Sequence, residues 1–529
     1  MPDIEKAYAL FKKYRKARTS LTDRIIQNEQ WYKLRHTQPM STDRYVPASA
    51  WLFNSLAVKH ADAMEAMPMP YVSAREPSDT ESAKALSKLL PVILERNDFP
   101  SVYSAVWNDK LKHGTGCYGV FWNPTVNSGL GDIEIKRIDV LNLFWEPGVG
   151  ELDASPNLFH CELRSIDEIM QSYPRIKEIT ADPAEECARY FYDDEVDVSD
   201  KTTVVDWYYK KRNDEGDTVL HYCKFIKGYK LYCTEDYPEY EKTGLYAHGR
   251  YPFVTDVMYG IEGTPCGFGS LDIMKDAQMQ IDRLNYAILE NAKMSAQRRF
   301  FIRADGSVSE QEFADWTRPF VHIQGAGLGE DSIREITAPP LSHIYLDVIN
   351  NKITELKETS GNRDVTAGGT EGGVIAAAAI SVLQESGSKM TKDMIASSYR
   401  SFCKVCDIIL ELVRQFYTVP RCVRILAPDG VSVDYISYDN SKIKAIESVC
   451  GEGDEKMTRV PAFDVSVHAE KSVASKRNEV NIMAKELYKM GVFSPENRSS
   501  ARIMLSMMDF EGRDQILEAI EEAIENEGK

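Results

Sequence analysis

The chain has 529 residues, 43% of them hydrophobic and 27% charged, a composition that excludes a disordered protein and predicts about two to four packed regions. Its net charge of −18 argues against a protein that grips nucleic acid through a basic surface. Ten cysteines without regular spacing exclude a disulfide framework, and neither the charged start of the chain nor the apolar stretch 374–383 predicts a secretory signal or a membrane span.

The first part of the chain, to about residue 115, predicts helices. Apolar residues recur at helical spacing between Leu10 and Ile25, and similar patterns cover 54–67, 80–96 and 102–113. From Cys117 the pattern changes to short runs of β-branched and aromatic residues separated by turn-forming residues. We expect strands over 117–122, 132–139, 204–211 and 219–233. Residues 117 to about 260 therefore predict a mixed region that is rich in antiparallel strand pairs.

A long helix is predicted to begin at Ser270, which is a suitable N-cap, and to end near Arg298. Its apolar residues recur at steps of three and four: Met274, Ala277, Ile281, Leu284, Ile288 and Ala292. The helix would be about 40 Å long at about 1.5 Å per residue. The narrow apolar stripe favours packing between neighbouring helices over packing on a sheet.

A small α/β insert is predicted to follow, with short strands around a helix over 310–317. A second helix then carries its own narrow stripe: Tyr345, Ile349, Ile353 and Leu356. The two helices would form a hairpin with the insert at its tip. The glycine-rich segment 360–373 comes next, before a long helix over 375–417, a strand-bearing region over 420–470 and a helical end from Ser475.

Three motifs could carry chemistry. GTGCYG, with Gly114, Gly116 and Gly119, matches a dinucleotide fingerprint, but a helix precedes it and a strand follows, so a tight turn is the favoured interpretation. Cys403 and Cys406 lie within a helical pattern, which favours packing over metal or redox chemistry. The acidic segment 193–200 lacks the glycine and terminal glutamate of a calcium loop. We expect no enzyme, cofactor or metal.

The order of elements after residue 250 resembles the portal proteins of tailed bacteriophages. The resemblance rests on residues 251–299, with their GFGS step into the long helix, then on the strand-bearing insert and on residues 341–402. It implies an α+β portal fold with a wing, long stem helices, a small α/β clip and a C-terminal helical crown. The implied boundaries are 1–268 for the wing, 269–299 for stem helix 1, 300–341 for the clip, 342–360 for stem helix 2, 361–374 for the channel loop, 375–418 for the helix bordering the channel, 419–474 for the wing return strands and 475–529 for the crown.

The resemblance also implies a function and partners. Subunits would form a ring, usually of twelve, at one capsid vertex, and double-stranded DNA would pass through it during packaging and ejection. The terminase large subunit, a head–tail adaptor or head-completion protein, and the capsid and scaffolding proteins would be partners, with no membrane. The protein would occupy the virion and, during assembly, the host cytoplasm. The alternatives are another phage head or tail structural protein, or a nucleotide-dependent nucleic-acid enzyme using GTGCYG.

Site residues follow from the same resemblance. Arg363, with Lys352 and Lys357 at lower rank, is a candidate for contact with DNA in the channel. Arg298, Arg299 and Arg303 are candidates for terminase docking on the clip. The stem helices would pack their stripes against the next subunit, through Met274, Ile281, Leu284, Ile288, Ile349 and Ile353.

Overall fold

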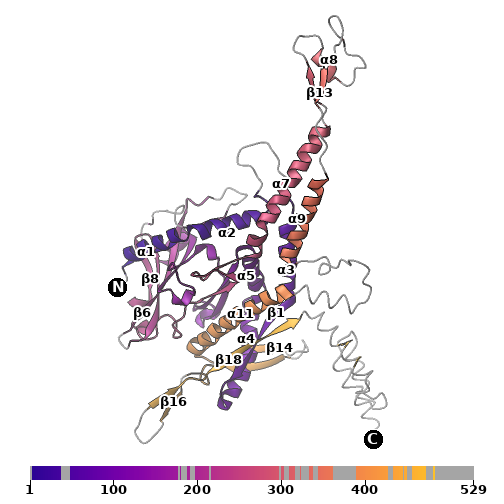
Figure 1. The fold of residues 1–529 in the computed structure, drawn as a ribbon. Coiled ribbons are helices and arrows are strands. Elements are labelled where there is room, and N and C mark those ends of the chain that lie inside the picture. Colours follow the sequence, from indigo (N-terminus) through magenta and orange to yellow (C-terminus); the bar gives the residue numbers. More distant parts are fainter. Residues whose placement is uncertain are drawn as a thin grey trace.

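A mixed body of helices and sheets carries one long projecting helical hairpin (Figure 1). The structure is a computed structural model, and it describes residues 3–36, 48–176, 179, 187–190, 197–213, 216–296, 299–302, 309–315, 322, 333–336, 343–361, 389–426, 433–444, 446–449, 456–471, 481–482 and 486. The hairpin consists of α7 (Ser270–Ala296) and α9 (Ile344–Ser360). The α+β class expected from the sequence is therefore observed.

One end of the body is a five-stranded antiparallel sheet covered by the first helix. The strand order is β4 (Leu143–Trp145), β5 (Asn157–Ser165), β6 (Lys201–Arg212), β7 (Thr218–Ile226) and β8 (Tyr229–Cys233). The helix α1 (Ile4–Ala17) begins at Asp3, whose carboxylate accepts the amide N–H of Lys6. Its apolar face, with Phe11 and Tyr14, is buried against Phe144 and Phe159. The helix α6 (Ile166–Ser172) follows β5.

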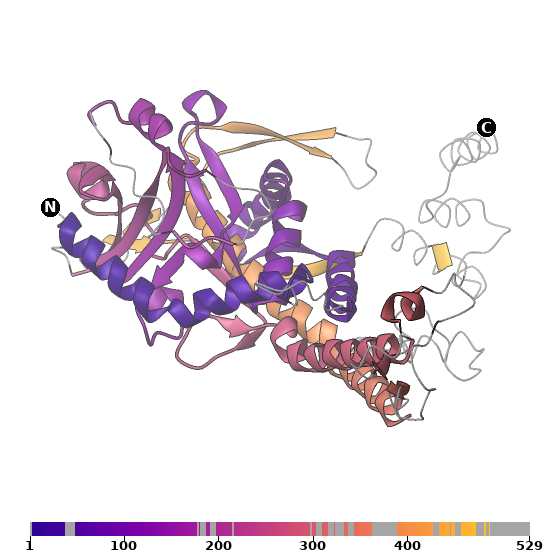
Figure 2. The same ribbon diagram turned by 90° about the horizontal axis from the view of Figure 1, so that it is seen from above.

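The centre of the body is a three-stranded sheet, β3 (Asp132–Arg137), β2 (Thr115–Asn123) and β9 (Phe253–Val257), packed between helices. These helices are α2 (Thr19–Tyr32), α3 (Trp51–Glu65), α4 (Thr80–Arg96), α5 (Phe99–His113) and α11 (Lys389–Phe416). Figure 2 shows α1 and α2 running along one flank of the body. The largest apolar core joins α2, α3, α4, α5 and α11.

The glycine motif GTGCYG forms the tight turn between α5 and β2. Gly114 ends α5 in the left-handed conformation at φ +81°, and a Cβ atom there would lie 2.2 Å from the carbonyl carbon of Phe268. A Cβ atom on Gly116 would lie 2.4 Å from the carbonyl oxygen of Val106. The helix precedes the strand, as expected, so the motif brings backbones together and has no strand–turn–helix geometry for a pyrophosphate.

One strand within the part predicted to be helical was missed. Residues Ala66–Ala74 form β1, which pairs along its whole length with β18 (Phe463–Lys471). The predicted helix over 54–67 therefore ends at Glu65. Pro68 and Pro70 interrupt the usual signal of a strand, but β1 pairs on one side only, where such prolines are tolerated.

Short antiparallel pairs complete the described strands. They are β10 (Tyr259–Gly260) with β11 (Gly267–Phe268), β12 (Arg299–Ile302) with β13 (Ile333–Ile336), β14 (Arg421–Leu426) with β15 (Val433–Tyr438), and β16 (Ile446–Val449) with β17 (Lys456–Arg459). The pair β12–β13 and the short helix α8 (Glu310–Ala314) lie at the far tip of the hairpin (Figure 1). Of the two strands expected around this helix, the second lies outside the described residues except for His322, and β13 was not predicted.

Candidate functional site

The projecting hairpin is anchored by apolar side chains on its inner faces. The helices α7 and α9 lie side by side in both views (Figures 1 and 2) and contact each other along their length. Met274 and Ile281 on α7 are 1% and 0% exposed, and Ile349 on α9 is also buried. Leu284, Ile288 and Ile353 are partly buried and join the same core.

Part of the predicted stripe packs within the subunit. Met274, Ile281 and Ile349, which we expected to pack against a neighbouring subunit, are buried by their own subunit. The reason is that α3 and α5 pack against α7 at the base of the hairpin and α9 packs beside it, so the periodic stripe faces inward. Met274, Ile281 and Ile349 therefore hold the hairpin to the body, and contact with a neighbouring subunit stays a prediction for the partly buried Leu284, Ile288 and Ile353.

Large apolar side chains lie exposed on the outer half of the hairpin. On α7, Leu289 is 45% and Met294 is 50% exposed, while on α9 Ile344 is 61% and Leu346 is 49% exposed. We name these four residues, together with the exposed Tyr345 and Val348 beside them, the distal apolar band. A run of exposed apolar residues on two paired helices is typical of an interaction surface, whereas single exposed residues need no explanation.

A buried carboxylate ties the hairpin to the segment after α2. Asp282 on α7 is 2% exposed and accepts hydrogen bonds from the Ser49 amide at 2.9 Å, the Ser49 hydroxyl at 2.7 Å and the Gln278 amide at 2.9 Å. Nε2 of His36 lies 3.1 Å from its other oxygen. Burial alone would raise the pKa of Asp282, but these hydrogen bonds outweigh burial and lower it below 3.8.

We expect Asp282→Asn to lower the free energy of unfolding by about 1–3 kcal/mol at neutral pH, because the amide replaces one acceptor oxygen by a donor. A carboxyl group whose folded pKa lies below 3.8 stabilises the fold above that pH, and this contribution is lost as the pH falls through the folded value. The difference between wild type and variant should therefore shrink below about pH 4. Denaturant unfolding of both proteins at several pH values measures this difference in the free energy of unfolding.

The matched control for this variant is Asp276→Asn, on an exposed position of the same helix. Its effect should stay within about 0.5 kcal/mol and should not follow the acid transition of Asp282. A constant difference between wild type and Asp282→Asn down to pH 3 would contradict the role assigned to this carboxylate.

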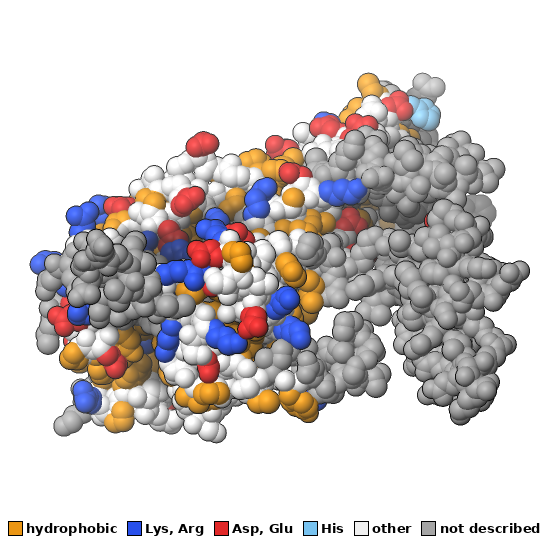
Figure 3. Space-filling view, turned by 90° about the horizontal axis from the view of Figure 1, so that it is seen from below, with side chains coloured by type: hydrophobic (Ala, Val, Ile, Leu, Met, Phe, Trp, Pro, Cys, Tyr) orange, Lys and Arg blue, Asp and Glu red, His pale blue; other side chains and the backbone are white. Residues whose placement is uncertain are grey.

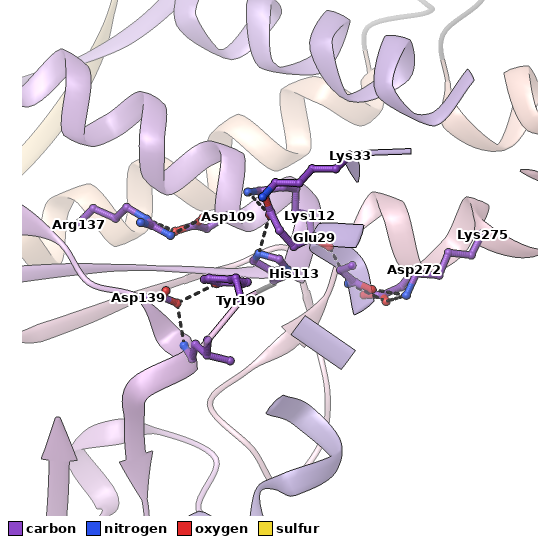
Figure 4. A network of polar contacts seen from close by, with 12 residues as sticks. Glu29, Lys33, Asp109, Lys112, His113, Arg137, Asp139, Tyr190, Asp272 and Lys275 are labelled. Carbon is purple, nitrogen blue, oxygen red and sulfur yellow. Dashed lines mark hydrogen bonds and ion pairs between the residues drawn. The ribbon is translucent and has the colours of Figure 1, made fainter. Parts of the chain in front are cut away.

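A polar network joins the base of α7 to α2 and α5 (Figure 4). Nζ of Lys112 lies 2.7 Å from the Glu29 carboxylate, which Lys33 also approaches at 3.7 Å. The Asn28 side chain donates to Asp272 at 3.0 Å, in the first turn of α7. On the other side of α5, Arg137 forms an ion pair with buried Asp109. These contacts fix the direction in which α7 leaves the body.

Comparison with known protein families identifies the family of the chain. The family model described as "Phage P22-like portal protein" matches residues 61–528, which is most of the chain. The chain belongs to the P22-like portal protein family. No match to the chain was found among curated proteins. The resemblance to phage portal proteins that the sequence suggested is thus confirmed.

Portal proteins are structural proteins, and Cys403 and Cys406 lie within a helix, as the sequence predicted. Cys406 is fully buried within α11 and Cys403 partly so, as expected for helix packing. Among the described residues, no group of His, Cys, Asp or Glu side chains is arranged to hold a metal ion. No described helix of this portal protein combines the length and apolar character needed to cross a bilayer.

The basic residues singled out from the sequence are only partly described. Arg298, Arg303 and Arg363 lie outside the described residues, and Arg299 is placed in β12 by its backbone alone. Lys352 forms an ion pair with Glu355 at 2.7 Å. Nζ of Lys357 lies 5.8 Å from the ring centroid of Trp51. Among the described residues on the face seen in Figure 3, Lys and Arg side chains are interspersed with Asp and Glu.

Proposed function

We propose that the chain is a ring-forming portal subunit, and that double-stranded DNA passes through the ring during packaging and ejection. The observation that carries this proposal is the distal apolar band on a projecting hairpin in a member of the portal family. An exposed apolar surface on paired helices is stabilised when a second copy covers it, and a repeated heterologous contact closes into a ring. The ring would lie at a capsid vertex and contain about twelve subunits, by analogy with the family.

Within this proposal, α7 and α9 are the stem helices, and β12, β13 and α8 belong to the clip. The proposal keeps the boundaries 269–299, 300–341 and 342–360 for the first stem helix, the clip and the second stem helix, and the projection of α7 and α9 from the body supports it (Figure 1). The clip would dock the terminase large subunit, and the head–tail adaptor, capsid and scaffolding proteins would bind elsewhere on the ring. The acidic chain, with a net charge of −18, would let DNA slide because few phosphate contacts would retain it.

Imaging of the purified protein by negative-stain microscopy, together with native mass spectrometry, tests the proposal. We expect rings with a central hole and about twelve copies, formed either alone or when scaffolding protein is supplied. As a control, the imaging is repeated over a range of salt concentrations. A ring that is held together by apolar surface should persist as the ionic strength rises. A stable compact dimer under all of these conditions would contradict the proposal.

A further inference from the structure

Two cysteines face each other on neighbouring strands at one edge of the five-stranded sheet. Cys223 on β7 and Cys233 on β8 are direct cross-strand partners, and both are free thiols that are 0% exposed. Opposed residues of an antiparallel pair have Cα atoms about 4.5–5.5 Å apart. A disulfide requires a Cα separation of about 4.4–6.8 Å. The spacing of the two strands therefore permits a bond between the two sulfurs.

The two thiols are hydrogen-bonded to each other, and they differ in their protonation. Cys223 donates to the sulfur of Cys233, which also accepts the backbone amide of Glu235. Sγ of Cys233 lies 3.9 Å from the hydroxyl oxygen of Tyr209. The hydrogen bonds, above all that from Cys223, outweigh burial and lower the pKa of Cys233 from 9.0 to about 6. Cys233 is therefore the thiolate of the pair at neutral pH, and Cys223 keeps its proton.

Other buried cysteines of the chain lack this activation. Burial raises the pKa of Cys117, Cys161 and Cys406, so these thiols stay protonated at neutral pH. Sγ of Cys187 lies 4.0 Å from the carbonyl oxygen of Cys161, and burial raises the pKa of Cys187 as well. The thiolate, and not the thiol, is the nucleophile in cysteine chemistry. The low pKa therefore distinguishes Cys233 from a cysteine that merely lies near another.

The pair lies where the sheet opens most easily. The five-residue β8 is the last strand in the order of the sheet, and its register with β7 shifts between Lys224 and Phe225. A short edge strand with an irregular ladder opens locally at a lower free energy than the central strands. Neighbours of Cys233, including His221 and Glu235, line a cavity of about 520 Å³. An oxidant close to water in size therefore has a route to the sulfur when β8 opens.

We propose that Cys223 and Cys233 form a redox pair, which hydrogen peroxide converts into a disulfide that fastens the edge strand β8 to the sheet. The Cys233 thiolate attacks one peroxide oxygen, the O–O bond breaks, and hydroxide leaves a sulfenic acid on Cys233. The sulfur of Cys223 then attacks that of Cys233, the S–O bond breaks, and water leaves with the proton of Cys223. The hydroxide takes up a proton from solvent. Two thiols thus lose two electrons, and one peroxide is reduced to two waters.

A single conditional bond of this kind differs from a disulfide framework, which the irregular spacing of the ten cysteines excludes. Thiols stay reduced in the cytosol, whereas disulfides persist outside cells. The pair would therefore be open during assembly in a host and closed in a released particle, a difference that rests on the proposed function. The oxidation of the two thiols itself requires neither a ring nor a partner protein, so its test is independent of that function.

Peptide mapping of the folded full chain after treatment with hydrogen peroxide tests the pair. The remaining thiols are alkylated in denaturant, and the chain is digested with trypsin. Three lysines lie between the two cysteines, so the disulfide appears as the peptide 213–224 linked to the peptide 231–242. We expect this product from the folded chain, with Cys403 and Cys406 of α11 still alkylated as an internal control. Full alkylation of Cys223 and Cys233 would overturn the proposal, as would their linkage to other cysteines.

Single serine variants separate the roles of the two thiols. Cys223→Ser keeps a hydroxyl donor beside Cys233 but cannot close the bond, so dimedone should trap a sulfenic acid on Cys233. In Cys233→Ser the remaining Cys223 lacks a thiolate partner, and its oxidation should be slower than that of Cys233 in the other variant by at least about 10-fold. Equal rates in the two variants would overturn the assignment of Cys233 as the nucleophile. The mapping of the wild type stays decisive if either variant does not fold.

Hydrogen exchange measures whether the bond fastens β8. A disulfide that closes a loop of about ten residues should slow the exchange of the β8 amides about 10- to 100-fold. The matched control is β4, the strand at the opposite edge of the same sheet, whose exchange should not change. Dithiothreitol should restore the original rates in β8. Unchanged exchange of β8 in protein that contains the mapped disulfide would overturn the fastening role.

Discussion

Lys110→Met is expected to destabilise the subunit by about 3–5 kcal/mol, because it leaves Asp256 as a buried carboxylate without its cation. Both side chains are 0% exposed, and Nζ of Lys110 lies 2.8 Å from the Asp256 carboxylate. The same ammonium group donates to the Ser398 hydroxyl at 2.8 Å and the Met394 carbonyl at 3.1 Å. The pair therefore joins α5, β9 and α11 at the centre of the body, where water cannot replace a lost partner.

The measurement is denaturant unfolding of Lys110→Met beside two other variants. Lys110→Met with Asp256→Asn removes both charges, so it should recover part of the lost stability. Lys293→Met breaks an exposed ion pair with Glu290 and should change stability by less than about 0.5 kcal/mol. If Lys110→Met were no more destabilising than Lys293→Met, the buried pair would not hold the three elements together.

Local patterns predicted the long elements because their signals lie within a few residues. The helix α7 begins at Ser270 as expected and ends two residues before the predicted end. The helix over 80–96 was predicted with the bounds that α4 has. The strand β1 was not predicted because its two prolines interrupt the alternation of apolar and polar residues that is typical of a strand. Its partner β18 also lies almost 400 residues further along the chain.

The contacts that define the candidate sites could not be predicted in the same way. Asp282 lies outside the periodic apolar stripe of its helix, yet it is buried because Ser49 and His36, more than 230 residues earlier, supply its donors. Lys110 and Asp256 likewise meet only through the fold. The distal apolar band was missed, except for Tyr345, for a different reason. Periodicity finds apolar residues on one helix face, but it does not distinguish a face buried in the protein's own core from one that stays exposed in the subunit.

Replacing Leu289 and Leu346 by aspartate is expected to abolish ring assembly without unfolding the subunit. Both side chains are about half exposed in the subunit, so the substitutions remove little packing within it. If a neighbouring subunit covers them, burial of the exposed half of each leucine contributes about 0.8–1.5 kcal/mol, and burying the charge of each aspartate costs more than this. The combined loss weakens each contact by at least about 100-fold.

The control variant is Tyr229→Asp, which changes an equally exposed apolar residue on β8, far from the hairpin. Native mass spectrometry should find its rings unchanged, while thermal unfolding should find both variants folded. Ile281→Asp cannot serve this purpose, because it places a charge in the core of the subunit itself and prevents folding. The two variants therefore distinguish the buried face of the hairpin, which packs within the subunit, from the exposed face that we propose as a contact between subunits. Rings of normal size and concentration dependence in the Leu289 and Leu346 double variant would assign assembly to another surface.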